Sequence, residues 1–224
     1  MIDLVYRTVL SALNKEQRGY LTPTEFNEFA YQAQVEIYES YFYSLARAIA
    51  TYGTMEVAFE NIPDHLMEKL ENFRSVATLN VDGGAVALPE DLYRLGEVFL
   101  GQVLVDRVSH SQIRYVVNSP LTYPSERQPV YTRTGNTLTI YPQQTSRVRV
   151  EYIRALSSTP KWVGTTLNGQ LIYNQQDSID FELDFSEEPE LVAKILAYAG
   201  VSVRSAEVTQ AASQKDQQLT QSEQ

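Results

Sequence analysis

The stretch that decides the fold reads TPTEFNEFAYQAQVEIYESYFYSLARAIATY and spans residues 22–52. It begins with a helix-start pattern, because Thr22 can act as the N-cap, Pro23 suits the first helical position and Glu25 stands three residues after the cap. No glycine and no further proline interrupts the stretch before Gly53. We therefore predict one helix of about 29 residues, roughly 44 Å long.

The apolar residues of this helix fall into two stripes at spacings of three and four. The first stripe consists of Phe26, Ala30, Ala33, Ile37, Tyr41, Leu45, Ala48 and Tyr52, and the second of Tyr31, Val35, Tyr38, Phe42, Ala46 and Ile49. Two interpretations stay open. The helix is surrounded by its own domain, or it gives the first stripe to the core and the tyrosine-rich second stripe to another subunit.

The composition, with 43% hydrophobic and 21% charged residues, is that of an ordinary globular protein. The chain has no cysteine, which excludes disulfides, thiolate metal sites and a cysteine nucleophile. His65 and His110 are far apart in the sequence, so a histidine metal site or a catalytic triad is disfavoured. No apolar run approaches about 18 residues and the start lacks a signal-peptide pattern, so we expect no membrane segment and a protein that is made and kept, or assembled, inside a cell.

Charge is unevenly distributed along the sequence. The net charge is −10, which disfavours tight binding to nucleic-acid phosphates. Residues 127–161 nevertheless carry six basic residues against one acid, whereas residues 162–224 carry ten acids against three bases. Two such regions can dock head to tail between copies of the chain or pair within one copy, and both interpretations stay open.

A subunit interface is the first functional expectation that these patterns give. On the long helix, the second stripe supplies five of the predicted interface residues, and the two charged regions supply the others. The predicted interface residues are Tyr31, Val35, Tyr38, Phe42, Ile49, Arg147, Arg149, Asp180, Glu182 and Asp184.

The rest of the chain predicts an α+β protein. Further helices are expected over residues 2–14, 61–73 and from about 187 onward, followed by a polar, glutamine-rich tail. Between the helices, strands follow one another too closely for crossover helices, which predicts an antiparallel sheet. The expected segments are hairpins at 76–88 and 130–141, a strand pair at 95–105 that turns at Gly101-Gln102, strands at 112–117, 147–154 and 178–185, and a loop at 118–128.

The predicted architecture has two domains. Residues 1–75 and 187–224 form a helical bundle around the long helix, at about 23–52, and residues 76–186 form an antiparallel β-sheet or sandwich domain.

The densest group of possible catalytic residues is acidic. It consists of Asp177, Asp180, Glu182, Asp184, Glu187 and Glu188. Paired carboxylates can transfer protons or bind Ca²⁺, but a spacing of two is what the solvent face of a half-exposed strand gives, and no EF-hand pattern is present. We therefore favour a solvated strand face and predict no catalytic residues, no metal and no cofactor. The basic region also contains tyrosines, a mixture found in single-strand nucleic-acid binders, but the acidic balance opposes that function.

Several short motifs follow one another along most of the chain. They are GYLTP (19–23), FNEFA (26–30), QAQ (32–34), LPEDLYRL (88–95), GNTLTIYP (135–142), VRVEY (148–152) and KILAYAGV (194–201). In this order they resemble the head-to-tail adaptor proteins of short-tailed bacteriophages, the group that includes tail tubular protein A. The sequence is most similar to the ring proteins of crAss-like phages.

The resemblance implies a structural virion protein of the neck, not an enzyme. In such families twelve copies form a ring on the tail side of the portal protein, the helices pack between neighbouring copies, and the next tail or ring protein follows below. Double-stranded DNA passes through the lumen without sequence-specific binding during ejection, and no membrane is involved. The protein would be assembled in the host cytoplasm and reside in the virion. Because a basic lumen would retain DNA, we expect residues 127–161 to face protein neighbours.

Two other functions remain as alternatives. An accessory carbohydrate- or receptor-binding module of a virion would show exposed aromatic residues on one face of a sheet. A hydrolase would use the carboxylates of residues 177–188.

Overall fold

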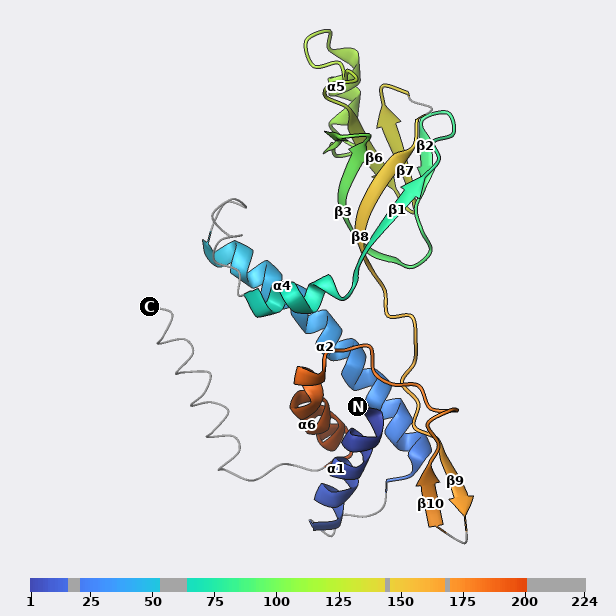
Figure 1. The fold of residues 1–224 in the computed structure, drawn as a ribbon. Coiled ribbons are helices and arrows are strands. Elements are labelled where there is room, and N and C mark those ends of the chain that lie inside the picture. The colour runs from blue at the N-terminus through green and yellow to red at the C-terminus, as the bar shows by residue number, and fades with distance from the viewer. Residues whose placement is uncertain (16–20, 53–63, 144–145, 168–169, 201–224) are drawn as a thin grey trace. The chain divides into compact units, whose positions relative to one another are not determined.

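The computed structural model describes residues 1–15, 21–52, 64–143, 146–167 and 170–200 (Figure 1). The chain divides into two compact units. We call residues 1–53 with 158–224 the helical unit, and residues 54–157 the β unit. Helices and sheets are both present, which confirms the α+β class. Among the described residues, no helix has the length and apolar character needed to cross a membrane.

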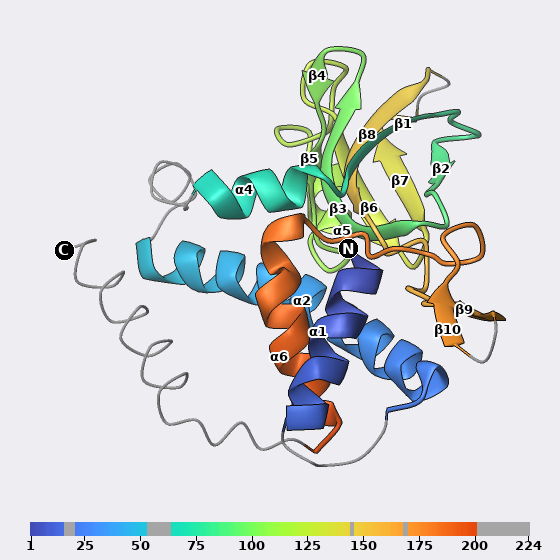
Figure 2. The same ribbon diagram turned by 60° about the horizontal axis from the view of Figure 1, so that its bottom comes forward.

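Three helices make up most of the described part of the helical unit. They are α1 (Ile2–Lys15), α2 (Pro23–Tyr52) and α6 (Glu188–Tyr198), and α6 follows the 3-10 turn η1 (Phe185–Glu187). Helix α6 packs against both α1 and α2 (Figure 2). The predicted helices at 2–14 and 22–52 are confirmed, and the predicted last helix begins near residue 187 as expected.

The start of α2 confirms the predicted helix-start pattern. The backbone N–H of Thr22 donates to Glu25 Oε2 at 2.9 Å, and the N–H of Glu25 donates to Thr22 Oγ1 at 3.3 Å. The Thr22 hydroxyl also donates to Glu25 Oε2 at 2.7 Å. These bonds lower the pKa of Glu25, first through the Thr22 hydroxyl and then through its backbone. A reciprocal capping box therefore fixes where α2 begins.

A short hairpin in the helical unit was not predicted from the sequence. Strands β9 (Gly164–Leu167) and β10 (Gln170–Tyr173) pair antiparallel with each other. The hairpin lies beside the Trp162 indole, which stacks on the Tyr6 ring at a centroid distance of 4.1 Å. A Cβ atom on Gly164 would lie 2.6 Å from that indole, so a glycine is required where the strand passes it.

The β unit contains α4 (Asp64–Glu71) and two four-stranded sheets. The first sheet is antiparallel, in the order β1 (Arg74–Leu79), β8 (Val148–Arg154), β3 (Leu92–Leu100) and β4 (Val103–Leu104). The second has the order β2 (Ala85–Ala87), β7 (Thr137–Tyr141), β6 (Val130–Thr134) and β5 (Asp106–Arg107). Because β5 runs parallel to β6, this second sheet is mixed, whereas an all-antiparallel sheet was predicted.

Side chains from both sheets form one hydrophobic cluster. Six of its members are 0 or 1% exposed, namely Val86, Val98, Leu138, Ile140, Val148 and Val150. They come from β2, β3, β7 and β8, so strands of both sheets depend on the same buried apolar area.

The turns of the β unit were predicted better than the strand partners. The two-residue turns Gly101-Gln102 and Gly135-Asn136 connect paired strands, as expected. Asp82 and Ala85 exchange both backbone hydrogen bonds around Gly83-Gly84, so that tight turn is also present. The hairpin predicted around it is wrong, however, because β1 pairs with β8 and β2 pairs with β7 in the other sheet.

Two predicted strands are not strands. Residues 112–117 lie largely in the helix α5 (Ile113–Asn118), whose first turn is closed by bonds from the N–H groups of Ile113 and Val116 to the carbonyls of Ser109 and Gln112. Residues 178–185 form only an isolated bridge between Lys161 and Ile179, before η1 begins. In both cases the apolar periodicity is present, but no neighbouring strand in the described part of the chain completes a ladder.

The domain boundaries also differ from those predicted. Helix α4 belongs to the β unit, and residues 158–186 belong to the helical unit. The physical reason is that the segment after residue 158 packs and bonds with α1 and α2, which the sequence spacing did not reveal. The start of the predicted 61–73 helix and the glutamine-rich tail lie outside the described residues.

Candidate functional site

The Asp180 carboxylate lies at the start of α1. Its Oδ2 is 2.8 Å from the Met1 amino nitrogen, and its Oδ1 accepts the Ile2 N–H at 2.7 Å. Burial raises the pKa of Asp180, but the hydrogen bonds from the ammonium group and from the N–H groups of Phe181 and Ile2 outweigh it and keep that pKa below its usual value. Asp180 therefore anchors the first turn of α1, where the helix dipole favours a negative charge.

Glu182 and Gln34 join three segments of the helical unit. Glu182 Oε1 accepts the backbone N–H of Ser158 at 2.6 Å and its hydroxyl at 2.9 Å. The Gln34 side chain is fully buried, where it accepts the Glu182 N–H at 2.9 Å and donates to the Ser158 carbonyl at 3.4 Å. A buried amide without such partners would be costly, so these bonds specify how the segments meet.

The next acids act at the start of α6. Asp184 accepts the Ser186 N–H at 2.9 Å and so caps η1. Glu187 is 3% exposed, and burial together with the nearby Glu187 carboxylate raises the pKa of Tyr41. Tyr41 therefore stays protonated at neutral pH and can serve as a hydrogen-bond donor in the core.

These contacts correct the prediction of a solvated acidic strand face. Asp180, Glu182 and Asp184, which were predicted to contact a second subunit, bind groups of their own unit instead. The reason is that residues 178–185 form no strand, so their carboxylates point at the ends of helices and at a neighbouring loop. Across the residues that the structure describes, no group of three or more His, Asp or Glu side chains could hold a metal ion.

The two apolar stripes of α2 are not divided between core and surface, which favours the interpretation that its own unit surrounds this helix. Tyr38 and Phe42, from the second stripe, are 3% and 2% exposed, so they are buried together with Phe26 and Ile37 of the first stripe. Among the members of the second stripe whose side chains the structure describes, Tyr31 is the large one that remains exposed, at 46%. The physical reason is the width of the buried face, because adjacent positions such as 37 and 38 both point toward the core in a helix covered from two sides.

The other predicted helix positions give less information. Val35 is half-buried, and the side chain of Ile49 lies outside the described part of α2. Tyr43, which was not predicted to be at an interface, is 73% exposed.

The two predicted arginines lie on the β unit. Arg147 is exposed and precedes β8 directly. The Arg149 guanidinium carbon lies 4.5 Å from the centre of the Phe99 ring, and its Nη2 is 3.6 Å from Glu151 Oε1. Both arginines therefore keep a charged group at the surface of the first sheet.

The short sequence motifs contain residues that link distant segments of the helical unit. Asn27 makes two bonds to the backbone of Trp162, accepting its N–H at 2.7 Å and donating to its carbonyl at 3.1 Å. The Trp162 indole N–H in turn donates to Asp3 Oδ1 at 3.0 Å. Asn27, on α2, thus fixes the backbone of Trp162. Through that backbone it also positions the indole ring, which stacks on Tyr6 of α1.

Helix α6 is fixed to α2 through another of these motifs. Lys194 Nζ lies 2.8 Å from Glu36 Oε1, and the Tyr198 hydroxyl donates to the other oxygen of Glu36. The bond from Lys194 and then that from Tyr198 lower the pKa of Glu36. Burial and the Glu36 carboxylate raise the pKa of Tyr198 to about 12.

The same is true of motifs in the β unit. The Tyr152 hydroxyl donates to the two carboxylate oxygens of Asp91 at 3.1 and 3.2 Å. Asn136, in the β6–β7 turn, accepts the Leu88 N–H through its backbone at 2.9 Å and donates to the Leu88 carbonyl through its side chain at 3.1 Å. These residues connect loops to strands, which is a structural role rather than a chemical one.

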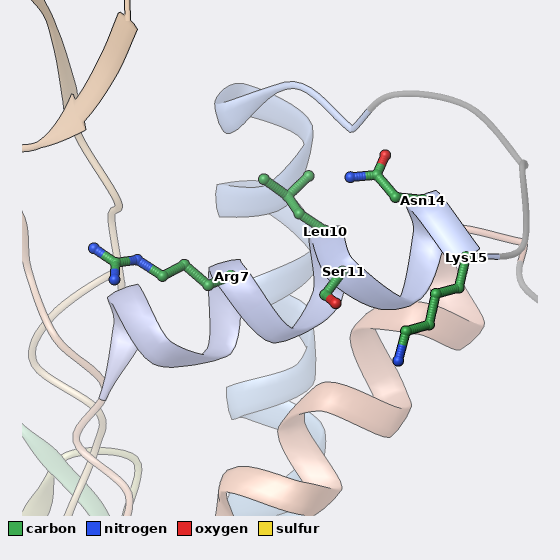
Figure 3. Close-up of a pocket in the computed structure, with 5 residues that line it drawn as sticks. All are labelled: Arg7, Leu10, Ser11, Asn14 and Lys15. Atoms are coloured by element: carbon green, nitrogen blue, oxygen red, sulfur yellow. The ribbon is translucent and has the colours of Figure 1, made fainter.

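Sequence reasoning missed a shallow hollow on the outer face of α1. It has a volume of about 530 Å³ and is lined by Arg7, Leu10, Ser11, Asn14 and Lys15 (Figure 3). Arg7 and Lys15 extend at its two ends, with the small Ser11 between them. The sequence predicted a helix over residues 2–14 but did not distinguish this face of it.

Sequence reasoning also missed an exposed aromatic residue. Phe185, which was predicted to point inward, is 63% exposed at the start of η1. The signal for exposure is the run of acids on both sides, but the alternating pattern of residues 178–185 obscured it.

Comparison with known proteins gives no assignment. No protein-family model matches the sequence, and no curated protein matches it. The residues and their contacts are therefore the basis of the functional argument that follows.

Proposed function

We propose that this protein is a structural virion subunit of the head-to-tail connector, or neck ring, of a short-tailed bacteriophage. The observation that carries the proposal is the role of the motifs that resemble adaptor proteins. Asn27, Asp91, Asn136 and Lys194 all stand in these motifs, and each bonds to a segment far away in the sequence. A likeness in these motifs is therefore a likeness in the contacts that specify a fold.

The proposed subunit works by shape and assembly rather than by chemistry. Twelve copies surround the DNA channel, join the portal protein to the next tail or ring protein, and allow DNA to leave during ejection. A net charge of −10 supports this function, because an acidic channel repels phosphates and lets DNA slide. In the finer architecture we propose, α1, α2 and α6 form a bundle and the two four-stranded sheets form a sandwich.

The basic residues of the β unit have a specific place in this proposal. Arg147 and Arg149 keep their charges at the surface, and in a DNA channel they would bind phosphates. We therefore propose that they face a protein neighbour in the ring. The variant Arg147→Glu/Arg149→Glu should impair ring assembly. Normal assembly with altered DNA retention would place these arginines in the channel instead.

The alternative functions receive less support from the structure. A carbohydrate-binding module would be favoured by exposed aromatic residues on a sheet face. In the described strands of the two four-stranded sheets, the aromatic side chains are buried or half-buried instead. A carboxylate hydrolase would need acids that face a substrate, whereas Asp180, Glu182 and Asp184 bond to backbone groups of their own unit.

Electron microscopy of purified virions tests the proposal directly. We expect density for this chain in a ring between the portal and the tail, with the DNA channel at its centre. As a control for incorporation, an antibody against the chain should label disrupted particles at the neck and should not label empty procapsids that lack tails. Density at the capsid surface or in tail fibres, or particles without the chain, would refute the connector function.

A further inference from the structure

The α1 hollow has the features of a receptor for an aromatic side chain. Its middle is formed by small residues, because Ser11 lies between Arg7 and Lys15, and Thr8 and Ala12 line its adjoining side. Arg7 is 71% exposed, with its Nη2 at 2.9 Å from Asp3. A cation placed over the face of an aromatic ring attracts it, so Lys15, and Arg7 once its side chain turns from Asp3 toward Ser11, can contact a ring seated on this face (Figure 3).

The same unit exposes an aromatic side chain with the opposite charge around it. Phe185 is 63% exposed, and the acids Asp184 and Glu188 stand beside it in the sequence. Phe185 has a large apolar ring without a polar group, and aromatic residues are enriched at the cores of protein interfaces. The acids around Phe185 carry the opposite charge to the cations around the hollow, so the two surfaces are electrostatically complementary.

A single copy does not bring these two features together. Asp180 bonds to the start of α1. In Figure 2, α1 and α6 run side by side in the same direction, so the segment that precedes α6 lies toward the beginning of α1. The hollow runs from Arg7, in the second turn of α1, to Lys15, the last residue of the helix. Because Phe185 is 63% exposed, its ring does not occupy this hollow in its own copy.

We propose that Phe185 of one copy of this chain inserts into the α1 hollow of a second copy, with Arg7 and Lys15 on either side of the ring. This contact rests on the proposed ring assembly and names the surfaces that form it. Because the two surfaces are different and each copy carries both, the contact is heterologous, and it closes into a ring when the rotation between copies allows it. Phe185 serves as the anchor of a larger interface, as buried aromatic residues commonly do.

Disulfide trapping tests this contact, because the natural chain has no cysteine. One variant carries Asn14→Cys at the rim of the hollow, and another carries Ser186→Cys beside Phe185. Both positions are exposed, and both changes leave the anchor intact. On mixing the purified proteins with an oxidant, we expect a mixed disulfide dimer. A chain with both cysteines should give a ladder of larger oligomers.

Matched variants make the result specific. Asn14→Cys mixed with Ser111→Cys, an exposed serine of the β unit, is the control pair and should cross-link more slowly. In the doubly cysteine-substituted chain, Phe185→Ala should slow ladder formation roughly tenfold, whereas Tyr115→Ala, which also removes an exposed aromatic, should leave the rate unchanged. Lys15→Glu should slow it as well, and Lys15→Glu with Glu188→Lys should restore it. Circular dichroism of each variant confirms that the helices are intact.

The outcome is separable from that of the connector proposal. If the Asn14–Ser186 pair cross-links no faster than the control pair, or if Phe185→Ala has no effect, the contact is refuted even where virions show a neck ring. If the ladder forms as expected but the chain is found elsewhere in the virion, the contact stands and the connector function is refuted.

Discussion

The helical unit and the β unit are stabilised in different ways. In the helical unit, side chains such as Asn27, Gln34 and Asp180 bond to backbone groups that lie 124 to 178 residues away in the sequence. In the β unit, strand ladders and one apolar cluster account for most of the order. The comparison teaches that a helix pair needs polar links to fix its loops, whereas paired strands satisfy their own backbone.

The largest expected effect comes from the β-unit cluster. Ile140→Ala, at a fully buried position of β7, should lower the free energy of unfolding by about 2–5 kcal/mol, because it removes buried methyl groups and leaves a cavity. Urea denaturation followed by circular dichroism measures it. Leu121→Ala, at a position that is 97% exposed, is the control and should change little. Equal shifts for the two variants would show that the cluster is not the main source of stability in this unit.

Asn27→Ala should have the second largest effect, now in the helical unit. The change leaves the N–H and the carbonyl of Trp162 without their partner, which costs about 2 kcal/mol. Trp162 is the one tryptophan of the chain, so its fluorescence reports the unfolding of this unit alone. Asn14→Ala, on the exposed face of α1, serves as the matched control. An unchanged midpoint for Asn27→Ala would mean that apolar packing, not polar linking, determines this unit.

Tyr152→Phe removes a polar link within the β unit, the hydrogen bond from the Tyr152 hydroxyl to Asp91. The loss of the bond to Asp91 should cost about 1 kcal/mol, less than the loss at Asn27, because the strand ladders around Tyr152 remain. Urea midpoints of the two variants, compared in the same buffer, give the difference. A Tyr152→Phe effect larger than that of Asn27→Ala would reverse the comparison between the units.

The smallest expected effect is a pH dependence at Asp180. The folded-state pKa of this carboxyl is below its unfolded value, so its contribution to stability is present above the unfolded pKa and is lost as the pH falls through the folded one. Because the side chain is 53% exposed, solvent screening limits the effect to less than about 1 kcal/mol. Asp180→Asn should therefore flatten the acid side of the stability profile that Trp162 fluorescence reports. A profile with the wild-type slope would show that other acids dominate.

Local patterns predicted those elements whose stabilising contacts are close in sequence. The capping box at Thr22 and Glu25 and the Gly135-Asn136 turn are complete within four residues, so the local sequence was sufficient to place them. The strand at 148–154 was also predicted, since alternation of Val148, Val150 and Tyr152 gives one buried face.

Partners that lie far apart in sequence were not predicted. Residues 178–185 and 112–117 have the periodicity of strands, but a strand requires a neighbour, and that neighbour is absent in the described structure. The β9–β10 hairpin was missed because only the packing of Gly164 against Trp162 explains it. For the same reason the sequence indicated an interface on α2 but could not tell that Tyr38 and Phe42 are covered by the chain itself.

The sequence by itself determined the α+β class, the long helix with its start, and an acidic chain without cysteine chemistry, because these depend on composition and on contacts within a few residues. Only the tertiary structure decided that the acids of residues 180–184 fix loops and helix ends, and that Phe185 and the α1 hollow remain exposed. The physical reason is that burial and hydrogen-bond partners are properties of segments brought together by folding, which a one-dimensional pattern does not contain.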